Sequence, residues 1–287
     1  MKTLILYVFH RINDNVVNFI EYAVFESKKY HFVIISNATD NNIDSLNIPS
    51  YVTVIIRDNI GFDFGGWSVG LLENDRYKSY DNFLFLNASV VGPFIPPYFN
   101  QPWPDLVTFG LKGDIKIYGG TINNYNEYGH YVPGKSHHVQ SFSFALDRVG
   151  LDVYFDKEIF SLTKFNDSHL STIINCEVGG SRAILEAGYN IGCNMKRYEG
   201  TDFRFPERYN RDHYAADCMY DASYSSFFLH PYETIFIKSN RNINPIRYKH
   251  YLLTKRVSYP EDDSDSEEEE EKEIISYSGD EEIVKNS

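Results

Sequence analysis

The amino-acid sequence predicts an α/β fold, in which a mainly parallel β-sheet is flanked by helices, over about residues 1–255 of 287. Two observations support this prediction. Near-continuous apolar runs, which mark strands buried on both faces, are separated by segments whose apolar residues recur at helical spacing. Their order of strand, helix, strand, strand, helix, strand requires crossovers between parallel strands, so helices must cover both faces of the sheet.

Four strands and two helices are expected before Pro93. The strands are residues 3–9, 31–36, 51–56 and 83–86, and the helices are residues 13–29 and 67–73. Sheets of this kind bind ligands beyond the carboxyl ends of their strands. Polar residues follow all four ends: His10-Arg11, Asn37-Ala38-Thr39, Arg57-Asp58-Asn59 and Asn87-Ala88-Ser89. We therefore expect a ligand site where these residues converge.

The pattern after Pro93 is less regular. Strands are expected at residues 105–110, 115–118, 139–146 and 189–193, and helices at residues 155–163, 168–174 and 177–187. The last helix would end at Gly188, a common helix stop. A long loop rich in Gly, Asn and Tyr is expected at residues 119–136.

Acidic charge is concentrated at the end of the chain. The sequence holds 27 Lys+Arg and 40 Asp+Glu, a formal net charge of −13. From Glu261 onward there are 13 acidic and 2 basic residues, which leaves 27 acidic and 25 basic residues before that point. A run of glutamates repels itself and cannot form a core, so residues 256–287 are expected to be a disordered acidic tail. The nearly neutral remainder lacks the clustered cations that bind nucleic acid.

The cysteines and the apolar runs predict the compartment. Cys176, Cys193 and Cys218 are odd in number and widely spaced, which argues against a disulfide framework and favours a reducing compartment. No apolar run approaches the roughly 20 residues that span a bilayer. The apolar start of the chain is better explained as a core strand than as a signal peptide. These features predict a cytoplasmic protein without a transmembrane segment.

The first candidate motif runs from Arg57 to Trp67 and reads Arg-Asp-Asn-Ile-Gly-Phe-Asp-Phe-Gly-Gly-Trp. It leads from the third strand into a helix. Gly65 and Gly66 would let the backbone approach a ligand closely, and a helix N-terminus attracts phosphate. Asp63 would accept hydrogen bonds from a ribose or a base. The alternative is that Asp63 only caps the helix, and the residues alone favour neither explanation.

The second candidate motif is the triplet Asn87-Ala88-Ser89, which follows the fourth strand and precedes Gly92-Pro93. Many nucleotide-sugar transferases carry an Asp-x-Asp at this place in a sheet, where it holds a divalent cation against the diphosphate. The triplet of this chain has no carboxylate. It therefore argues against a metal ion held there by protein charge.

Together these motifs resemble the rhamnan synthesis protein F family, whose members are polysaccharide glycosyltransferases with a GT-A-like, Rossmann-like nucleotide-sugar fold. The shared residues are Asp63, Phe64, Gly65, Asn87, Ser89, Gly92 and Pro93. Segments 138–144, 176–181, 185–189, 230–238 and 244–245 extend the resemblance in patches over about residues 1–250. The chain departs from the family at Ala88, where the family has Asp. This departure removes the carboxylate that would approach a metal ion or the diphosphate, and it argues against metal use and against full activity.

The resemblance implies transfer of a sugar, a deoxysugar such as rhamnose being one candidate, from a nucleotide-sugar to a glycan or other hydroxyl acceptor with inversion. Such a reaction needs a base for the acceptor hydroxyl. Glu177 is the candidate base, and its alternative role is to complement the dipole of the helix that it would open. The expected donor-binding residues are Asp63, Gly65, Gly66, Asn87, Ser89 and Arg11. The expected acceptor-binding residues are His138, Gln140 and Ser141.

Without a carboxylate at position 88, the charge of the leaving diphosphate would fall to cations of the protein. The candidates are Arg11, Lys135, His137, His138, Lys238 and Arg241. Lys238 has a simpler alternative, the solvated end of a strand. His137 and His138 would point to opposite faces of a strand, so at most one would face the site. No metal ligands and no certain cofactor are predicted, with Mn²⁺ or Mg²⁺ as the alternative.

Two rival functions follow from the same residues. Ala88 suggests a catalytically silent protein that binds a carbohydrate or a nucleotide-sugar on the same fold. A nucleotidyltransferase is the other rival, and it would need metal-binding carboxylates near the fourth strand, which the sequence lacks. The partners expected are thus a nucleotide-sugar donor and a glycan acceptor, without nucleic acid.

Overall fold

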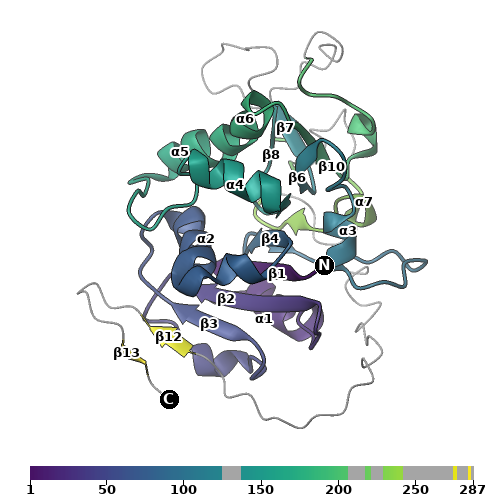
Figure 1. Ribbon diagram of the computed structural model, residues 1–287. Helices are drawn as coiled ribbons and strands as arrows, with labels where there is room; N and C mark the ends of the chain where they lie inside the picture. Colours follow the sequence, from purple (N-terminus) through teal and green to yellow (C-terminus); the bar gives the residue numbers. More distant parts are fainter. Residues whose placement is uncertain (125–136, 206–216, 221–228, 242–273, 277–283, 286–287) are drawn as a thin grey trace.

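The computed structural model describes residues 1–124, 137–205, 217–220, 229–241, 274–276 and 284–285. Its centre is a sheet in the strand order β10-β6-β9-β4-β1-β2-β3 (Figure 1). The strands are β1 (Thr3–Phe9), β2 (Tyr30–Ser36), β3 (Thr53–Ile56), β4 (Asn82–Asn87), β6 (Ile115–Gly119), β9 (Ser143–Asp147) and β10 (Asn190–Cys193). Among these strands, β9 alone runs antiparallel to its neighbours. The predicted α/β fold with a mainly parallel sheet is confirmed.

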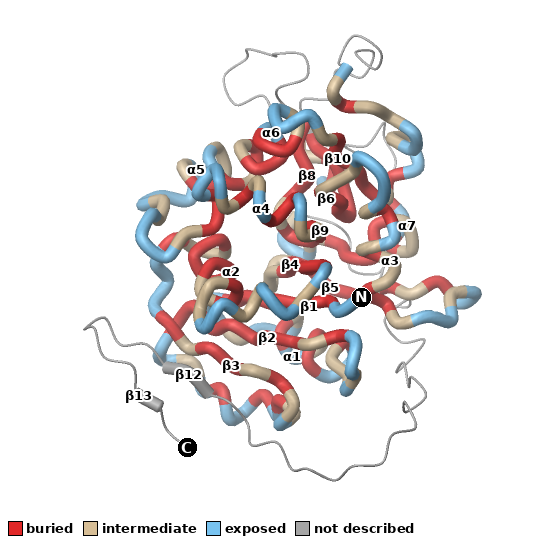
Figure 2. The backbone as a smooth tube through the Cα atoms, in the orientation of Figure 1, coloured by how far each residue is buried: buried red, intermediate tan, exposed pale blue. Residues whose placement is uncertain are grey.

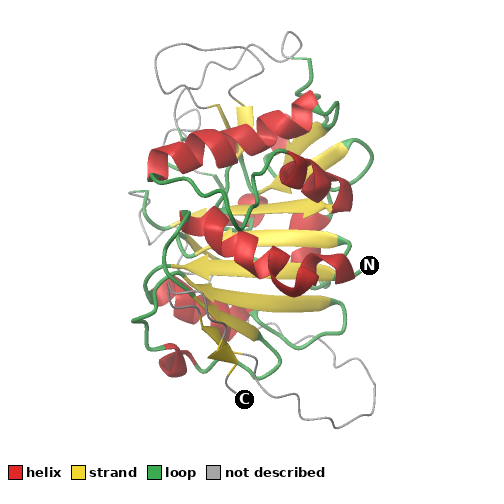
Figure 3. Cartoon of the chain, turned by 60° about the vertical axis from the view of Figure 1, so that its left-hand side comes forward, coloured by secondary structure: helices red, strands yellow, loops and turns green. Residues whose placement is uncertain are grey.

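Helices α1 (Asp14–Ala23) and α2 (Phe62–Leu72) cover opposite faces of this sheet (Figure 3). Tyr7 of β1 stacks on Phe19 of α1 with ring centroids 4.0 Å apart. Its neighbour Val8 lies against α2, since a Cβ placed on Gly66 would come within 2.8 Å of a Val8 methyl. Successive side chains of a strand point to opposite faces, so the two contacts require helices on both sides.

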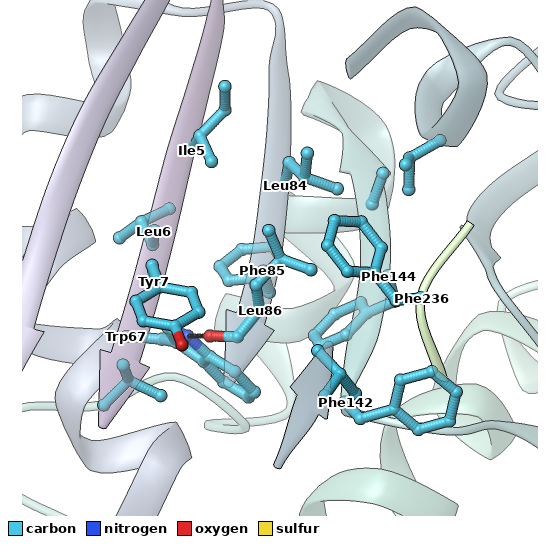
Figure 4. Packing of buried hydrophobic residues seen from close by; sticks show 14 of the residues in the cluster. Ile5, Leu6, Tyr7, Trp67, Leu84, Phe85, Leu86, Phe142, Phe144 and Phe236 are labelled. Atoms are coloured by element: carbon cyan, nitrogen blue, oxygen red, sulfur yellow. Dashed lines mark hydrogen bonds between the residues drawn. The ribbon is translucent and has the colours of Figure 1, made fainter. Parts of the chain in front are cut away.

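The core beneath α2 is rich in aromatic rings (Figure 4). Trp67 is fully buried, and its ring lies 5.6 Å from those of Phe85 and Phe144. Its indole N–H donates to the carbonyl of Leu86 at 3.3 Å, which satisfies the polar end of this large side chain. Figure 2 shows that buried residues follow the strands through the molecule. This continuous core fixes the position of α2 relative to the end of β4.

The remaining elements are short. The helices are α3 (Pro104–Thr108), α4 (Arg148–Asp156), α5 (His169–Thr172), α6 (Gly179–Glu186) and α7 (Pro231–Thr234). The strands are β5 (Val90–Val91), β7 (Ile122–Asn124), β8 (His137–Val139) and β11 (Ile237–Lys238). β5 pairs with β11, and β7 pairs with β8, in two small antiparallel sheets.

Several boundaries expected from the sequence are wrong. Residues 105–108, expected in a strand, belong to helix α3, because Pro104 in its first turn presets the helical backbone. α2 begins at Phe62, five residues before the expected start. The helix expected at residues 155–163 lies earlier in the chain, since α4 spans Arg148–Asp156. The strand expected at residues 139–146 is divided between β8 and β9.

The expected tail, residues 256–287, is described only at β12 (Ile274–Ser276) and β13 (Val284–Lys285). β12 lies parallel to β3 and extends the sheet, and β13 pairs with β12. The expectation that the tail is disordered otherwise falls outside the described residues.

The three cysteines are free and buried. Throughout the part of the chain that the structure describes, every helix is too short or too polar to traverse a bilayer.

The sheet has a topological switch point between β1 and β4. β1 pairs with β2 on one side and with β4 on the other, both in parallel. The chain therefore moves away from β1 in one direction and returns to its other side after β3. Open α/β sheets bind ligands beyond the carboxyl ends of the strands at such a point. Asn87, the last residue of β4, lies at this edge.

Candidate functional site

The first part of the site is the Asp63 cluster, formed by Asp63, Asn87 and Ser89. The side-chain amide of Asn87 donates to Oδ2 of Asp63 at 2.8 Å. Its oxygen accepts from the backbone N–H of Ser89 at 3.1 Å and from the Ser89 hydroxyl at 2.6 Å. One amide thus connects the first turn of α2 to the turn after β4. Three predicted donor-binding residues are brought together.

The helix-cap explanation for Asp63 is wrong. Gly61, with φ of 72°, is the residue that precedes α2, and no side chain caps this helix. Asp63 lies one residue inside the helix and directs its carboxylate to Asn87. Burial raises the pKa of Asp63 to about 6, although the hydrogen bond from Asn87 opposes the rise. A carboxylate with this pKa changes its charge just below neutral pH.

Gly65 and Gly66 lie inside α2 and face the protein interior. A Cβ on Gly65 would lie 2.0 Å from the carbonyl oxygen of Ile60, and one on Gly66 would lie 3.0 Å from Oδ1 of Asn37. Their glycine identity therefore follows from close helix packing. Contact of these residues with a donor remains a prediction.

Arg57 braces the turn that leads into α2. This buried guanidinium donates to Oδ1 of Asn37 at 2.7 Å and to the carbonyl of Ile60 at 2.6 Å. Asn37 in turn donates to the carbonyl of Phe62 at 2.9 Å. Burial lowers the pKa of Arg57 to about 10. These contacts hold the first turn of α2, and with it Asp63, against the ends of β2 and β3.

The second part of the site surrounds Glu177, which does not open a helix as expected. It lies in a π-helical segment, Ile173–Val178, that joins α5 to α6. The alternative in which Glu177 complements a helix dipole at an N-terminus is therefore wrong. Single π-helical turns within longer helices are frequent at functional sites, and here the turn directs Glu177 to the loop between β8 and β9.

The Glu177 cluster consists of His138, Ser141 and Glu177. Oε2 of Glu177 accepts a hydrogen bond from the backbone N–H of Ser141 at 2.8 Å and a second, short one from its hydroxyl. Oε1 lies 3.5 Å from Nε2 of His138, which is buried. Burial alone would raise the pKa of Glu177, but His138 and Ser141 together lower it to about 2. Glu177 is ionised at neutral pH.

The two neighbouring histidines point in different directions, as predicted. His138 faces Glu177, whereas the ring of His137 packs 5.5 Å from that of Phe203.

The Asp63 cluster and the Glu177 cluster are adjacent in space. The backbone N–H of Asn87 donates to the carbonyl of Phe142, the residue after Ser141, at 3.3 Å. The charge of Glu177 also acts on Asp63 and tends to raise its pKa.

A third group of polar side chains adjoins the Glu177 cluster, because Gln140 directly precedes Ser141 in the chain. The amide of Gln140 accepts from the Thr121 hydroxyl at 2.7 Å and donates to Oδ1 of Asp217 at 3.0 Å. The other oxygen of Asp217 accepts from Nε of Arg241 at 2.8 Å. Burial raises the pKa of Asp217, but the Arg241 hydrogen bond brings it below its usual value. Asp217 was not singled out as a site residue, because the sequence favoured an acceptor-side role only for the aromatic and charged stretch 197–224 as a whole, in which it lies.

Lys238 contributes an ammonium to the same region. Its expected alternative, a solvated strand end, is wrong, because β11 pairs with β5 and leaves Lys238 only partly exposed. The carboxylates of Glu177, Asp217 and Asp63 all act on this ammonium electrostatically. Burial has the larger influence and lowers the pKa of Lys238.

Arg11 is not brought to the site. It forms an ion pair with Asp40, and both side chains are largely exposed. Lys135, another candidate cation, lies outside the described residues. Among the residues that the structure describes, no three His, Cys, Asp or Glu side chains are grouped to hold a metal ion.

The fold and the site define an α/β protein that presents two carboxylate clusters at the switch point of its sheet. A family model described as rhamnan synthesis protein F matches residues 32–261, and the chain belongs to this family, as predicted. A relative, the uncharacterized protein y4gN of Sinorhizobium fredii, is 28% identical over 171 residues, which are 58% of this chain and 41% of the relative. The chain thus spans less than half of that protein's length.

One solved structure shows a more distant likeness. The glycosyltransferase GlyE of Streptococcus pneumoniae TIGR4 is 12% identical and aligns with a TM-score of 0.32, over 74% of this chain and 50% of that one.

Proposed function

We propose that the protein transfers a sugar from a nucleotide-sugar donor to a hydroxyl group of a glycan or other acceptor, with inversion at the anomeric carbon. Membership of the rhamnan synthesis protein F family supports a role in polysaccharide synthesis. The observation that carries the proposal is the pair of neighbouring carboxylates with opposite pKa shifts, about 6 for Asp63 and about 2 for Glu177. Environments that separate two pKa values in this way are typical of sites that assign different roles to two acids.

The Asp63 cluster would bind the donor. Ionised Asp63 has an oxygen, Oδ1, without a hydrogen bond among the described residues, and it would accept a hydrogen bond from a ribose or sugar hydroxyl. Asn87 and Ser89 would contact the diphosphate-sugar region, because they form the turn at the switch point. Gly65 and Gly66 would contribute by allowing α2 to approach the sheet.

The Glu177 cluster would bind the acceptor and remove its proton. As the acceptor oxygen attacks the anomeric carbon, its proton moves to Glu177 and the bond from that carbon to the diphosphate oxygen breaks. The electron pair of the broken bond leaves with the nucleoside diphosphate. Ser141 and His138 would hold the carboxylate in the ionised form. Gln140 would help to position the acceptor, and its hydrogen bond to Asp217 would hold its side chain in place.

A thermal-shift and turnover screen tests this proposal. Purified protein would be mixed with UDP-, GDP- and dTDP-sugars, with EDTA or with Mn²⁺, and release of nucleoside diphosphate would be measured with and without glycan acceptors. We expect one donor class to stabilise the protein and to be turned over. Failure of every donor to bind or react would refute the proposal.

One observation favours a second function, a silent nucleotide-sugar- or carbohydrate-binding protein. The low pKa of Glu177 makes it a weak base, because Ser141 and His138 stabilise its charge. Binding of a donor without any turnover, even slow hydrolysis, would support this second function and exclude the first. A cytoplasmic location remains a prediction.

A further inference from the structure

We propose that the ammonium group of Lys238 binds the diphosphate of the donor and neutralises the nucleoside diphosphate as it leaves, in the place that a divalent cation takes in other sites. The inference rests on the proposed function and assigns a further catalytic residue to it. The geometry that supports it is the position of Lys238 beside the turn of Asn87 and Ser89 and the lack of a bonded partner for its ammonium.

The backbone places Lys238 next to the donor turn. β11 pairs antiparallel with β5, and in this register Lys238 lies opposite Val90. The following residue, Ser239, donates its N–H to the carbonyl of Ser89 at 2.9 Å. Asn15 then donates to the carbonyl of Ala88 at 2.9 Å and to the Ser239 hydroxyl at 2.8 Å. The strand that carries Lys238 is therefore fastened to the turn that would face the diphosphate.

The ammonium itself has open hydrogen-bonding capacity. Within the described part of the chain, Nζ of Lys238 makes no hydrogen bond and no ion pair, and it lies 5.6 Å from the centroid of the Phe142 ring. Three carboxylates act on it through space, but none lies within ion-pair distance. A partly buried ammonium has three N–H donors, and leaving them all without acceptors is unfavourable. A phosphate oxygen would satisfy them.

The other cations near the site are already engaged. Arg241 donates to Asp217 at 2.8 Å, and Arg57 is held by the oxygens of Asn37 and Ile60. His138 faces Glu177. Unlike these described side chains, Lys238 remains available to a ligand. Neutralising charge on the leaving group is often the largest single contribution to such a reaction.

The test compares Lys238→Met, which keeps the length of the side chain, with Lys238→Arg, which keeps the charge. Calorimetric titrations would use UMP, UDP, GMP, GDP, dTMP and dTDP in EDTA. Lys112→Met is a matched control, because Lys112 is exposed and also lies near an aromatic ring, 5.9 Å from that of Phe109.

We expect wild-type protein and the Lys112 variant to bind one diphosphate more tightly than its monophosphate without a divalent cation. Lys238→Met should lose about 10- to 100-fold in diphosphate affinity, as expected for a charge-assisted hydrogen bond, and little in monophosphate affinity. Lys238→Arg should recover much of the difference. A purely structural role for Lys238 would weaken both nucleotides equally and would overturn the inference.

Two further outcomes separate this inference from the proposed function. If wild-type protein transfers sugar but requires Mn²⁺ or Mg²⁺, or if Lys238→Met keeps full turnover and the full preference for diphosphate, the role of Lys238 is refuted and sugar transfer stands. If wild-type protein neither binds nor turns over any nucleotide-sugar, both are refuted. Should Lys238→Met fail to fold, Lys238→Gln and Lys238→Arg provide the same comparison.

Discussion

The Asp63 cluster and the Glu177 cluster lie at the same edge of one sheet, yet they shift the pKa of their carboxylates in opposite directions. Asp63 receives one hydrogen bond from a neutral amide, and burial raises its pKa to about 6. Glu177 receives two hydrogen bonds from Ser141 and faces His138, and its pKa falls to about 2 despite burial. The number of donors around each carboxylate, more than its depth, decides its charge state.

The largest expected effect comes from Glu177→Gln. The amide keeps the shape of the side chain but cannot take a proton from the acceptor, so turnover should fall by about 10²- to 10⁴-fold. Donor affinity should stay within about twofold, because the Asp63 cluster is intact. Glu186→Gln, an exposed glutamate at the end of α6, is the matched control. Full turnover by Glu177→Gln would assign the base to another residue.

The next effect is on donor binding by Asp63→Asn. The amide removes the charge that would hold a ribose or sugar hydroxyl, and loss of a hydrogen bond to a charged group lowers affinity by roughly 10- to 100-fold. Calorimetric titration with the donor found in the screen measures this. Asp58→Asn, at an exposed aspartate just before the same helix, should bind normally. Unchanged affinity of Asp63→Asn would place the donor elsewhere.

Variants of the two clusters should change the free energy of unfolding in opposite directions. Removing the Ser141 hydroxyl with Ser141→Ala takes a hydrogen bond from ionised Glu177 and should reduce the free energy of unfolding at pH 7 by about 1–2 kcal/mol. Because the pKa of Glu177 is lowered on folding, this contribution is present above about pH 4.5 and is lost as pH falls toward 2. Urea unfolding at pH 7 and pH 3 would show a smaller loss at the lower pH. An equal loss at both would contradict the assigned pKa.

Asp63→Asn should act in the opposite direction on stability. A raised pKa means that the folded state holds its proton more tightly than the unfolded state, so stability is lost as pH rises through about 4 to 6. The variant removes this loss and should melt at the same or a higher temperature than wild type at pH 7, with no gain at pH 4. A large drop in the melting temperature at pH 7 would show that the carboxylate is structural.

The smallest effect is a shift in the pH profile of kcat/KM. The acid limb for donor turnover should lie near pH 6, set by Asp63 and not by Glu177. The residual activity of Asp63→Asn should be nearly flat between pH 5 and pH 7. An acid limb that persists unchanged in this variant would mean that another group controls it.

The sequence was most informative where strands are long and buried. β1 and β2 are continuous apolar runs, and their bounds match the prediction within one residue. Prediction failed where tertiary packing decides the local structure. Gly65 and Gly66 were expected in a turn before the helix, yet α2 begins at Phe62, because the missing side chains let it pack closely against the carbonyl of Ile60 at Gly65 and against Val8 of β1 at Gly66.

The site was predicted in part. Asp63, Asn87 and Ser89 converge, as do His138, Ser141 and Glu177, and each of them lies in a short motif that the sequence singled out. The engagement of Asp217 by Gln140 could not be predicted, since 77 residues separate them and no periodic pattern connects them. The exposed ion pair of Arg11 with Asp40 likewise depends on the fold of a loop.

The most direct test of sugar transfer at this site is single-turnover release of nucleoside diphosphate, measured side by side for wild-type protein and Glu177→Gln loaded with the same donor and acceptor. We predict rapid release from wild-type protein and a rate at least about 100-fold lower from the variant at equal donor occupancy. Equal rates would show that Glu177 is not the base, and no release from donor-saturated wild-type protein would contradict sugar transfer.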